Sequence, residues 1–99
     1  MAEDFLFMMF ATKIKMKSGS YYSQSLTEID EIYLIGCDNP GFFKKATLHD
    51  YLKDHPGSIQ VNIRPYPNCI PAISSNGEKY VKSSPNQYGH DNLLQLPRE

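Results

Sequence analysis

The stretch NLLQLP, residues 92–97, decides how this fold can close, because it places three large apolar side chains close to the last residue of the sequence. Left in water, each leucine would forgo about 1.5–3 kcal/mol of burial, and chain ends fray unless they are tied down. We expect this segment to lie back across a sheet and fill the open end of its core. Asp91 and Asn92 would then form the turn through bonds to backbone N–H groups. Two alternatives stay open: His90, Asp91 and Asn92 project and bind a ligand, or the leucines occupy a partner's groove.

The overall composition is that of one small globular domain. With 99 residues, 40% hydrophobic and 21% charged, the chain has globular values and a length suited to a single core. The formal net charge of −1 does not give the strongly basic balance of a general nucleic-acid binder.

The cysteines and the first residues predict a cytoplasmic protein with no membrane anchor. Cys37 and Cys69 form no CxxC motif, so two reduced thiols are expected. The start of the chain carries acids where a secretory signal has bases, and the apolar run at residues 5–11 is far shorter than the roughly 20 residues of a membrane helix. Residues 1–11 can form a strand, a helical turn or an arm that docks on a second copy.

Alternation of apolar and polar residues predicts most of the strands. In TKIKMK (12–17), Ile14 and Met16 face one side, and the lysines form a positive stripe on the other. Asn76-Gly77 is typical of a two-residue type I′ turn, which would place Ile73 opposite Tyr80 in a hairpin. The expected strands are 12–17, 28–35, 58–63, 70–75 and 78–83.

One short helix is expected over residues 48–55. Thr47 can cap its N-terminus, and Pro56-Gly57 ends it. Its apolar stripe repeats at i, i+3, i+4 and i+7 and consists of Leu48, Tyr51, Leu52 and His55. A helix this short needs support from a sheet. The sequence therefore predicts an α+β single domain: an antiparallel twisted sheet of about five strands, one short helix and an ordered C-terminal tail.

The end of the sequence, NGEKYVKSSPNQYGHDNLLQLPRE (76–99), resembles the close of the DUF3892 family of small bacterial and phage proteins. In that family a hairpin strand of the form G-x-K-Y-I/V-x-T precedes an N-L-L-x-L-P ending. Gly77, Lys79, Tyr80 and Val81 match the first part, and residues 92–97 match the second. The likeness continues more loosely upstream to residue 29, and residues 1–11 fall outside it. The resemblance implies the same fold and, since the family is a domain of unknown function, no particular activity.

Catalytic or metal-binding chemistry is not expected. His49, Asp50, Asp54 and His55 cluster in sequence, but the two histidines lack the i, i+4 spacing that brings two imidazoles to one ion. We interpret them as a solvated helix face, and we expect no cofactor.

These patterns favour a non-enzymatic binding module with a protein partner, encoded by a phage or mobile element. Dimerisation through residues 5–11 would cover apolar surface that one short helix leaves open. The alternative is a protein that binds nucleic acid or a nucleotide through the lysine stripe and loop aromatics. The candidate partner-binding residues are Arg64, Tyr80, Lys82, Tyr88, His90, Asp91 and Asn92.

Overall fold

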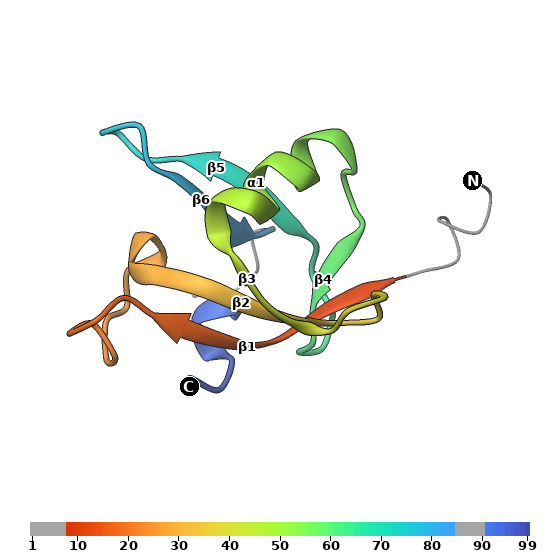
Figure 1. Cartoon of the computed structure of the whole chain (residues 1–99), viewed down its shortest axis with the longest axis horizontal. Coiled ribbons are helices and arrows are strands. Elements are labelled where there is room, and N and C mark those ends of the chain that lie inside the picture. Colours follow the sequence, from red (N-terminus) through yellow and green to blue (C-terminus); the bar gives the residue numbers. More distant parts are fainter. Residues whose placement is uncertain (1–7, 85–90) are drawn as a thin grey trace.

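The computed structural model of the chain describes residues 8–84 and 91–99. Its single α-helix and several strands confirm the α+β class (Figure 1). In chain order, the elements are β1 (Met9–Met16), the 3₁₀ helix η2 (Leu26–Glu28), β2 (Ile29–Ile35), β3 (Gly41–Lys44), α1 (Lys45–Asp54), β4 (Ile59–Val61), β5 (Cys69–Ile73), β6 (Lys79–Ser83) and the 3₁₀ helix η3 (Asn92–Gln95). No helix within the described ranges is long and apolar enough to cross a membrane.

The strands form two sheets rather than the expected single antiparallel one. One sheet has the order β3-β2-β1-β4, and β5 and β6 form a separate hairpin. β1 and β4 are parallel, with Met9 opposite Ile59, because the chain crosses back through α1 before it enters β4. An isolated antiparallel bridge, Gln60 opposite Asn68, joins β4 to the segment before β5, and the N–H of Val61 donates to Pro67 O at 2.8 Å. Pro65 and Pro67 have no N–H to donate, so this pairing does not extend into a ladder between the two sheets.

Residues 9–11 and 41–44 are strands that the sequence did not assign firmly. The end of the apolar arm enters β1, where Ala11 pairs with Leu34 of β2 and with Val61 of β4. β3 lies where no strand was predicted, and each of its residues pairs with β2.

The helix begins earlier than expected, and a different set of its side chains faces the core. α1 starts at Lys45, with Lys44 rather than Thr47 at the N-cap and no side-chain cap bond. Tyr51 and His55 are exposed. Its buried residues keep the spacing i, i+3, i+4 and i+7 and are Lys45, Leu48, His49 and Leu52. The expected stripe was right for Leu48 and Leu52 but wrong for Tyr51 and His55, because Lys45 and His49 complete the buried face instead.

His49 corrects the expectation of a fully solvated helix face. Its side chain is only 2% exposed, and its Nδ1 lies 3.2 Å from the backbone carbonyl oxygen of Tyr80. A carbonyl oxygen only accepts, so the Nδ1–H of His49 donates this bond. The histidine thereby joins α1 to β6.

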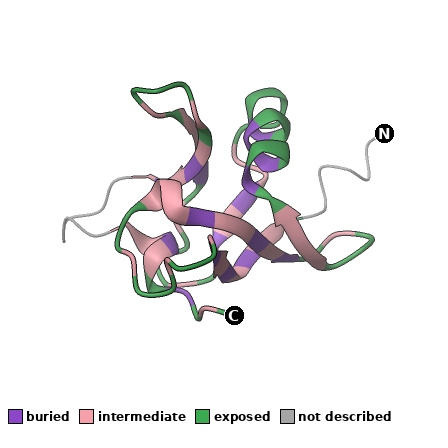
Figure 2. Ribbon diagram, turned by 60° about the vertical axis from the view of Figure 1, so that its left-hand side comes forward, coloured by how far each residue is buried: buried purple, intermediate pink, exposed green. Residues whose placement is uncertain are grey.

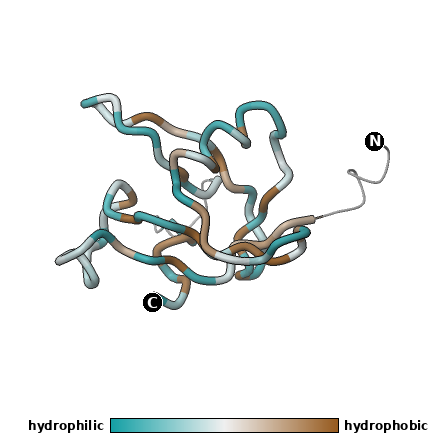
Figure 3. Tube along the Cα trace, in the orientation of Figure 1, coloured by the Kyte–Doolittle hydropathy of each residue, from teal (hydrophilic) through white to brown (hydrophobic). Residues whose placement is uncertain are grey.

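The core lies between the sheet, the helix, the hairpin and the tail. Figure 2 shows buried segments on the strands and on one side of α1, while the other side of the helix is exposed. Figure 3 shows the same separation as apolar stretches within the strands and hydrophilic stretches at the turns. The fully buried large side chains are Ile14, Ile29, Ile32, Leu52, Ile59, Val61 and Leu93.

The C-terminal tail is part of this core, as the leucine pattern predicted. Leu93 is 0% and Leu96 4% exposed. The backbone N–H of Ile14 donates to Pro97 O at 2.9 Å, and Glu99 N–H donates back to Ile14 O at 2.9 Å. The tail thus pairs in parallel with the second half of β1, while β4 pairs with the first.

The hairpin forms where it was predicted, but its register differs by one residue. Ile73 pairs with Lys79 rather than Tyr80. The N–H of Gly77 donates to Ser74 O at 3.0 Å, and the N–H of Ser74 donates to Glu78 O at 2.9 Å. This is a three-residue loop in which Gly77, at φ 87°, is the left-handed residue after a turn. A type I′ turn would require positive φ at Asn76 as well.

An ion cluster holds the hairpin loop against the rest of the molecule. Glu78 Oε2 accepts hydrogen bonds from Lys17 Nζ at 2.7 Å and from Lys45 Nζ. Lys45 also donates to the carbonyl oxygen of Thr27 at 2.5 Å, and its side chain is only 9% exposed. Glu78 therefore balances a nearly buried ammonium group at the start of α1.

Acid is expected to weaken this cluster. Hydrogen bonds from Lys17 and then Lys45 lower the pKa of Glu78 from 4.5 to about 2. Its stabilising contribution is complete above the unfolded value and is lost as the pH falls through the folded one. We expect Glu78→Gln to be less stable than the wild type at pH 7 and to lose less stability as the pH falls from about 5 to about 2. Urea denaturation at a series of pH values measures both effects.

Asp50→Asn is the matched control for that experiment. Asp50 also accepts a lysine bond, from Lys79 at 2.8 Å, but both side chains are about half exposed. The hydrogen bond from Lys79 lowers the pKa of Asp50 as well, but exposed pairs contribute little, so this variant should change the acid curve much less than Glu78→Gln does. Identical acid curves for Glu78→Gln and the wild type would contradict the assigned role of Glu78.

Candidate binding face

The predicted site residues lie on several different elements. Arg64 is exposed in the loop after β4, and Tyr80 and Lys82 are half-buried on β6. Asp91 and Asn92 lie in the turn that begins the tail. Tyr88 and His90 fall outside the described residues. Asp91 and Asn92 both contact Ser83 of β6, whereas no hydrogen bond within 8–84 and 91–99 joins Arg64 to any of the others.

The carboxylate of Asp91 joins the start of the tail to β6. One carboxylate oxygen accepts the N–H of Ser83 at 2.9 Å, and the other accepts the N–H of Leu93 at 2.8 Å. The Asn92 N–H donates to Ser83 Oγ at 3.1 Å. These bonds fasten η3 to the end of β6, as expected for a turn-forming Asp-Asn pair.

A different set of side chains meets on the outer face of the four-stranded sheet. Lys13 of β1 lies opposite Tyr33 of β2, which lies opposite Phe42 of β3. The Tyr33 and Phe42 rings meet edge to face with centroids 5.0 Å apart. Lys13 Nζ lies 5.0 Å from the Tyr33 ring centroid, and Lys15 Nζ lies 4.7 Å from that of Phe42.

The aromatic row continues toward the other edge of the sheet. Phe10 pairs with Ile35, which is two residues beyond Tyr33 on the same face of β2. The ring of Phe10 contacts Tyr66, from the loop after β4, with centroids 6.2 Å apart. We call this surface the aromatic–lysine face; its residues are Phe10, Lys13, Lys15, Tyr33, Phe42 and Tyr66. Each of them is half-buried or exposed.

The charges on and around this face are partly paired. Lys44 Nζ lies 3.1 Å from Glu31 Oε2 and 3.3 Å from Asp30 Oδ2, and these carboxylates raise the pKa of Lys44. Lys13 Nζ lies 4.0 Å from Glu99 Oε2. Such exposed pairs are weak, so the lysines can exchange these partners for an incoming anion.

The sequence showed the lysine stripe but not its neighbours. No strand was predicted over residues 41–44, and only the pairing of β3 with β2 brings Phe42 beside Tyr33. The positions of Lys13 and Tyr33 in their strands put them on the same side as Phe42. An alternation argument applied to residues 41–44 as a strand would have put Phe42 and Phe43 on opposite faces, but it would not have paired Phe42 with Tyr33.

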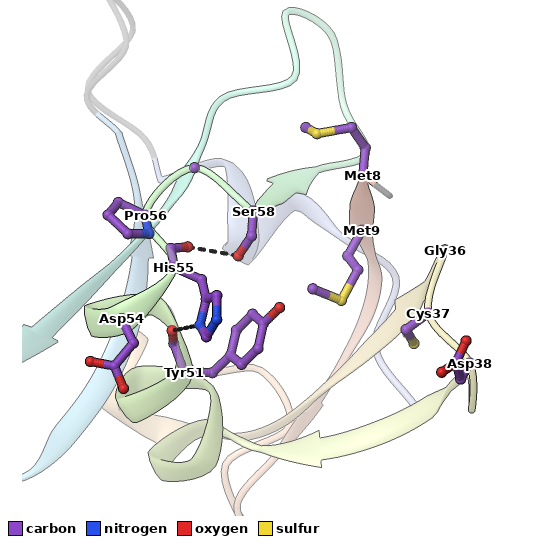
Figure 4. A pocket seen from close by; sticks show the side chains of 11 residues that line it. Met8, Met9, Gly36, Cys37, Asp38, Tyr51, Asp54, His55, Pro56 and Ser58 are labelled. Carbon is purple, nitrogen blue, oxygen red and sulfur yellow. Dashed lines mark hydrogen bonds between the residues drawn. The ribbon is translucent and has the colours of Figure 1, made fainter. Parts of the chain in front are cut away.

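A surface pocket of about 640 Å³ lies at the C-terminal end of α1 (Figure 4). Tyr51 and His55 border it from the helix, Met8 and Met9 from the start of β1, and Cys37 from the loop after β2. The rings of Tyr51 and His55 stack with centroids 4.3 Å apart. His55 Nδ1 lies 3.1 Å from the backbone oxygen of Tyr51, so this nitrogen donates within the helix.

Neither cysteine lies in a site that would activate its thiol. Both are free, and Cys37 is half-buried at the pocket edge. Burial raises the pKa of the Cys69 thiol to about 12, which keeps it protonated. Among the described residues, no group of three or more His, Cys, Asp and Glu side chains could hold a metal ion.

Comparison with family models matches residues 11–97 to DUF3892, a family described as a protein of unknown function. The chain belongs to the DUF3892 family. No curated protein and no solved structure matches it. The match begins within β1 and ends at Pro97 in the tail, so it covers the buried leucines of the tail and every residue of the aromatic–lysine face except Phe10.

Proposed function

We propose that this DUF3892 protein is a non-enzymatic binding module that engages its partner through the aromatic–lysine face. The supporting observation is the division of the four-stranded sheet into two unlike faces. Ile14 and Ile32 point into the core, while Lys13, Tyr33 and Phe42 gather on the opposite side and remain accessible. Aromatic side chains and cations are the groups that carry most binding energy at protein surfaces.

The other expected surfaces have less support. Tyr88 and His90 of the predicted tail site, and most of the predicted dimerisation arm, lie outside the described residues. Asp91 already uses both carboxylate oxygens within the fold. Replacing Asp91 would therefore test stability more than binding.

Capture from a lysate with matched bait proteins tests the proposal. The baits are the wild type, the double variant Tyr33→Ser/Phe42→Ser and the control Tyr22→Ser, whose side chain is 86% exposed outside this face. We expect a set of ligands, measured by mass spectrometry, that the wild type and Tyr22→Ser retain and the double variant loses. Thermal melting confirms that all three are folded. An identical captured set from all three baits would overturn the proposed surface.

A further inference from the structure

We infer that the ligand of the aromatic–lysine face is a single-stranded nucleic acid; this inference rests on the binding function proposed above. The geometry of the rings is the first argument. Phe42, Tyr33 and Phe10 come from three adjacent strands, and Tyr66 extends the row beyond them. Adjacent strands lie about 4.8 Å apart, so the rings form a row across the sheet rather than along one strand. A flexible single-stranded nucleic acid with exposed bases can follow such a row and stack one base on each accessible ring.

The lysines supply the second argument. Lys13 and Lys15 have their ammonium groups over the rings of Tyr33 and Phe42, at 5.0 and 4.7 Å. Each ammonium group thus covers the ring face that a base would occupy, and the flexible lysine side chain has to move from the ring to the neighbouring phosphate when the base stacks. Lys44 adds a third ammonium group at the β3 edge, with 63% of its side chain exposed.

Charge complementarity separates this ligand from a folded protein partner. The chain has a formal net charge of −1, yet three lysines, Lys13, Lys15 and Lys44, stand on this side of the sheet. Two carboxylates lie among them: Glu31 of β2, opposite Lys15 and Lys44, and Glu99, which lies 4.0 Å from Lys13. A strand that alternates bases and phosphates matches alternating rings and ammonium groups. A duplex hides its base faces and is the poorer match.

Fluorescence anisotropy with labelled oligonucleotides tests the inference on the full-length protein. The probes are oligo(dT) and oligo(U) of about 12 nucleotides, within the usual range of site sizes, and a duplex of the same length. We expect both single strands to bind more tightly than the duplex. With two or three phosphates contacted, raising the salt from about 50 to about 200 mM should weaken binding about tenfold.

Single substitutions locate the contact. We expect Tyr33→Ala and Phe42→Ala each to weaken binding about fivefold to a hundredfold. Lys15→Gln should weaken binding and reduce its salt dependence. Tyr22→Ala and Lys53→Gln, which replace the same residue types away from the face, should bind as the wild type does. Melting curves exclude unfolding as the cause.

Absence of binding at about 50 mM salt, or equal loss in the face variants and the controls, would overturn the inference. The capture experiment distinguishes this failure from that of the proposed function. If the double variant still loses a captured protein, the face binds a protein and only the nucleic-acid assignment fails. If nothing captured depends on the face, both fail.

Discussion

Cutting the chain after Gly89 is expected to leave the protein unfolded under conditions in which the full chain is folded. The cut removes Leu93 and Leu96 from the core, and it removes the parallel bridge between Ile14 of β1 and Arg98 of the tail. Each lost leucine costs about 2–5 kcal/mol, against a total stability of about 5–15 kcal/mol for a domain. Far-UV circular dichroism and a thermal melt of both chains measure the effect.

A single substitution in the full-length chain tests whether the fold needs the tail leucines to be buried, and not only the tail to be present. Leu93→Ala should lower the free energy of unfolding by about 2–5 kcal/mol. Each kcal/mol lost should lower the melting temperature by about 4–8 °C. Gln95→Ala is the matched control, because Gln95 belongs to the same η3 turn but is exposed. If the shortened chain melted at the wild-type temperature, the tail would be a free segment rather than part of the core.

The burial of these leucines was predictable because a purely local feature, three apolar side chains in a short segment, allowed few solutions. Asp91 was likewise predictable as a turn former, since Asp often bonds to backbone N–H groups close to it in sequence. Its second bond, to Ser83 N, depends on how the tail meets β6 and could not be read locally.

The errors share a different cause: they concern contacts between distant segments. The burial of His49 depends on the Tyr80 carbonyl, 31 residues away. β3 is four residues long and has little alternation of its own, so it becomes a strand through its pairing with β2. The hairpin register depended on whether one or two loop residues adopt positive φ, which the dipeptide Asn76-Gly77 does not decide alone.

The candidate face illustrates the same limit. Lys13 and Lys15 of the predicted lysine stripe follow from alternation within β1, whereas Lys17, its third member, lies beyond the strand and donates to Glu78. That Tyr33 and Phe42 lie beside it depends on two strand registers, β1 with β2 and β2 with β3. A slip of one residue would turn every side chain of a strand to the other face, and no local pattern fixed the registers.

Gly36→Ala is expected to be the most damaging small substitution at the end of β2. Gly36 has φ 84°, and a Cβ atom there would lie 2.3 Å from the backbone carbonyl oxygen of Met8. Alanine at this φ costs about 1–2 kcal/mol. Since the obstacle is backbone, the start of β1 must also move, and such overpacking adds about 1–3 kcal/mol. We expect a total loss of about 2–5 kcal/mol, measured by urea denaturation.

Two other glycines separate the contributions. Gly77→Ala adds a Cβ at φ 87° with nothing within 4 Å, so it should show the conformational cost alone. Gly41→Ala has neither positive φ nor a neighbour within 4 Å, and its stability should stay close to that of the wild type. The difference between Gly36→Ala and Gly77→Ala then measures how closely the end of β2 approaches the start of β1. Equal losses at the two positions would show that the Met8 carbonyl yields freely and that this approach does not constrain the fold.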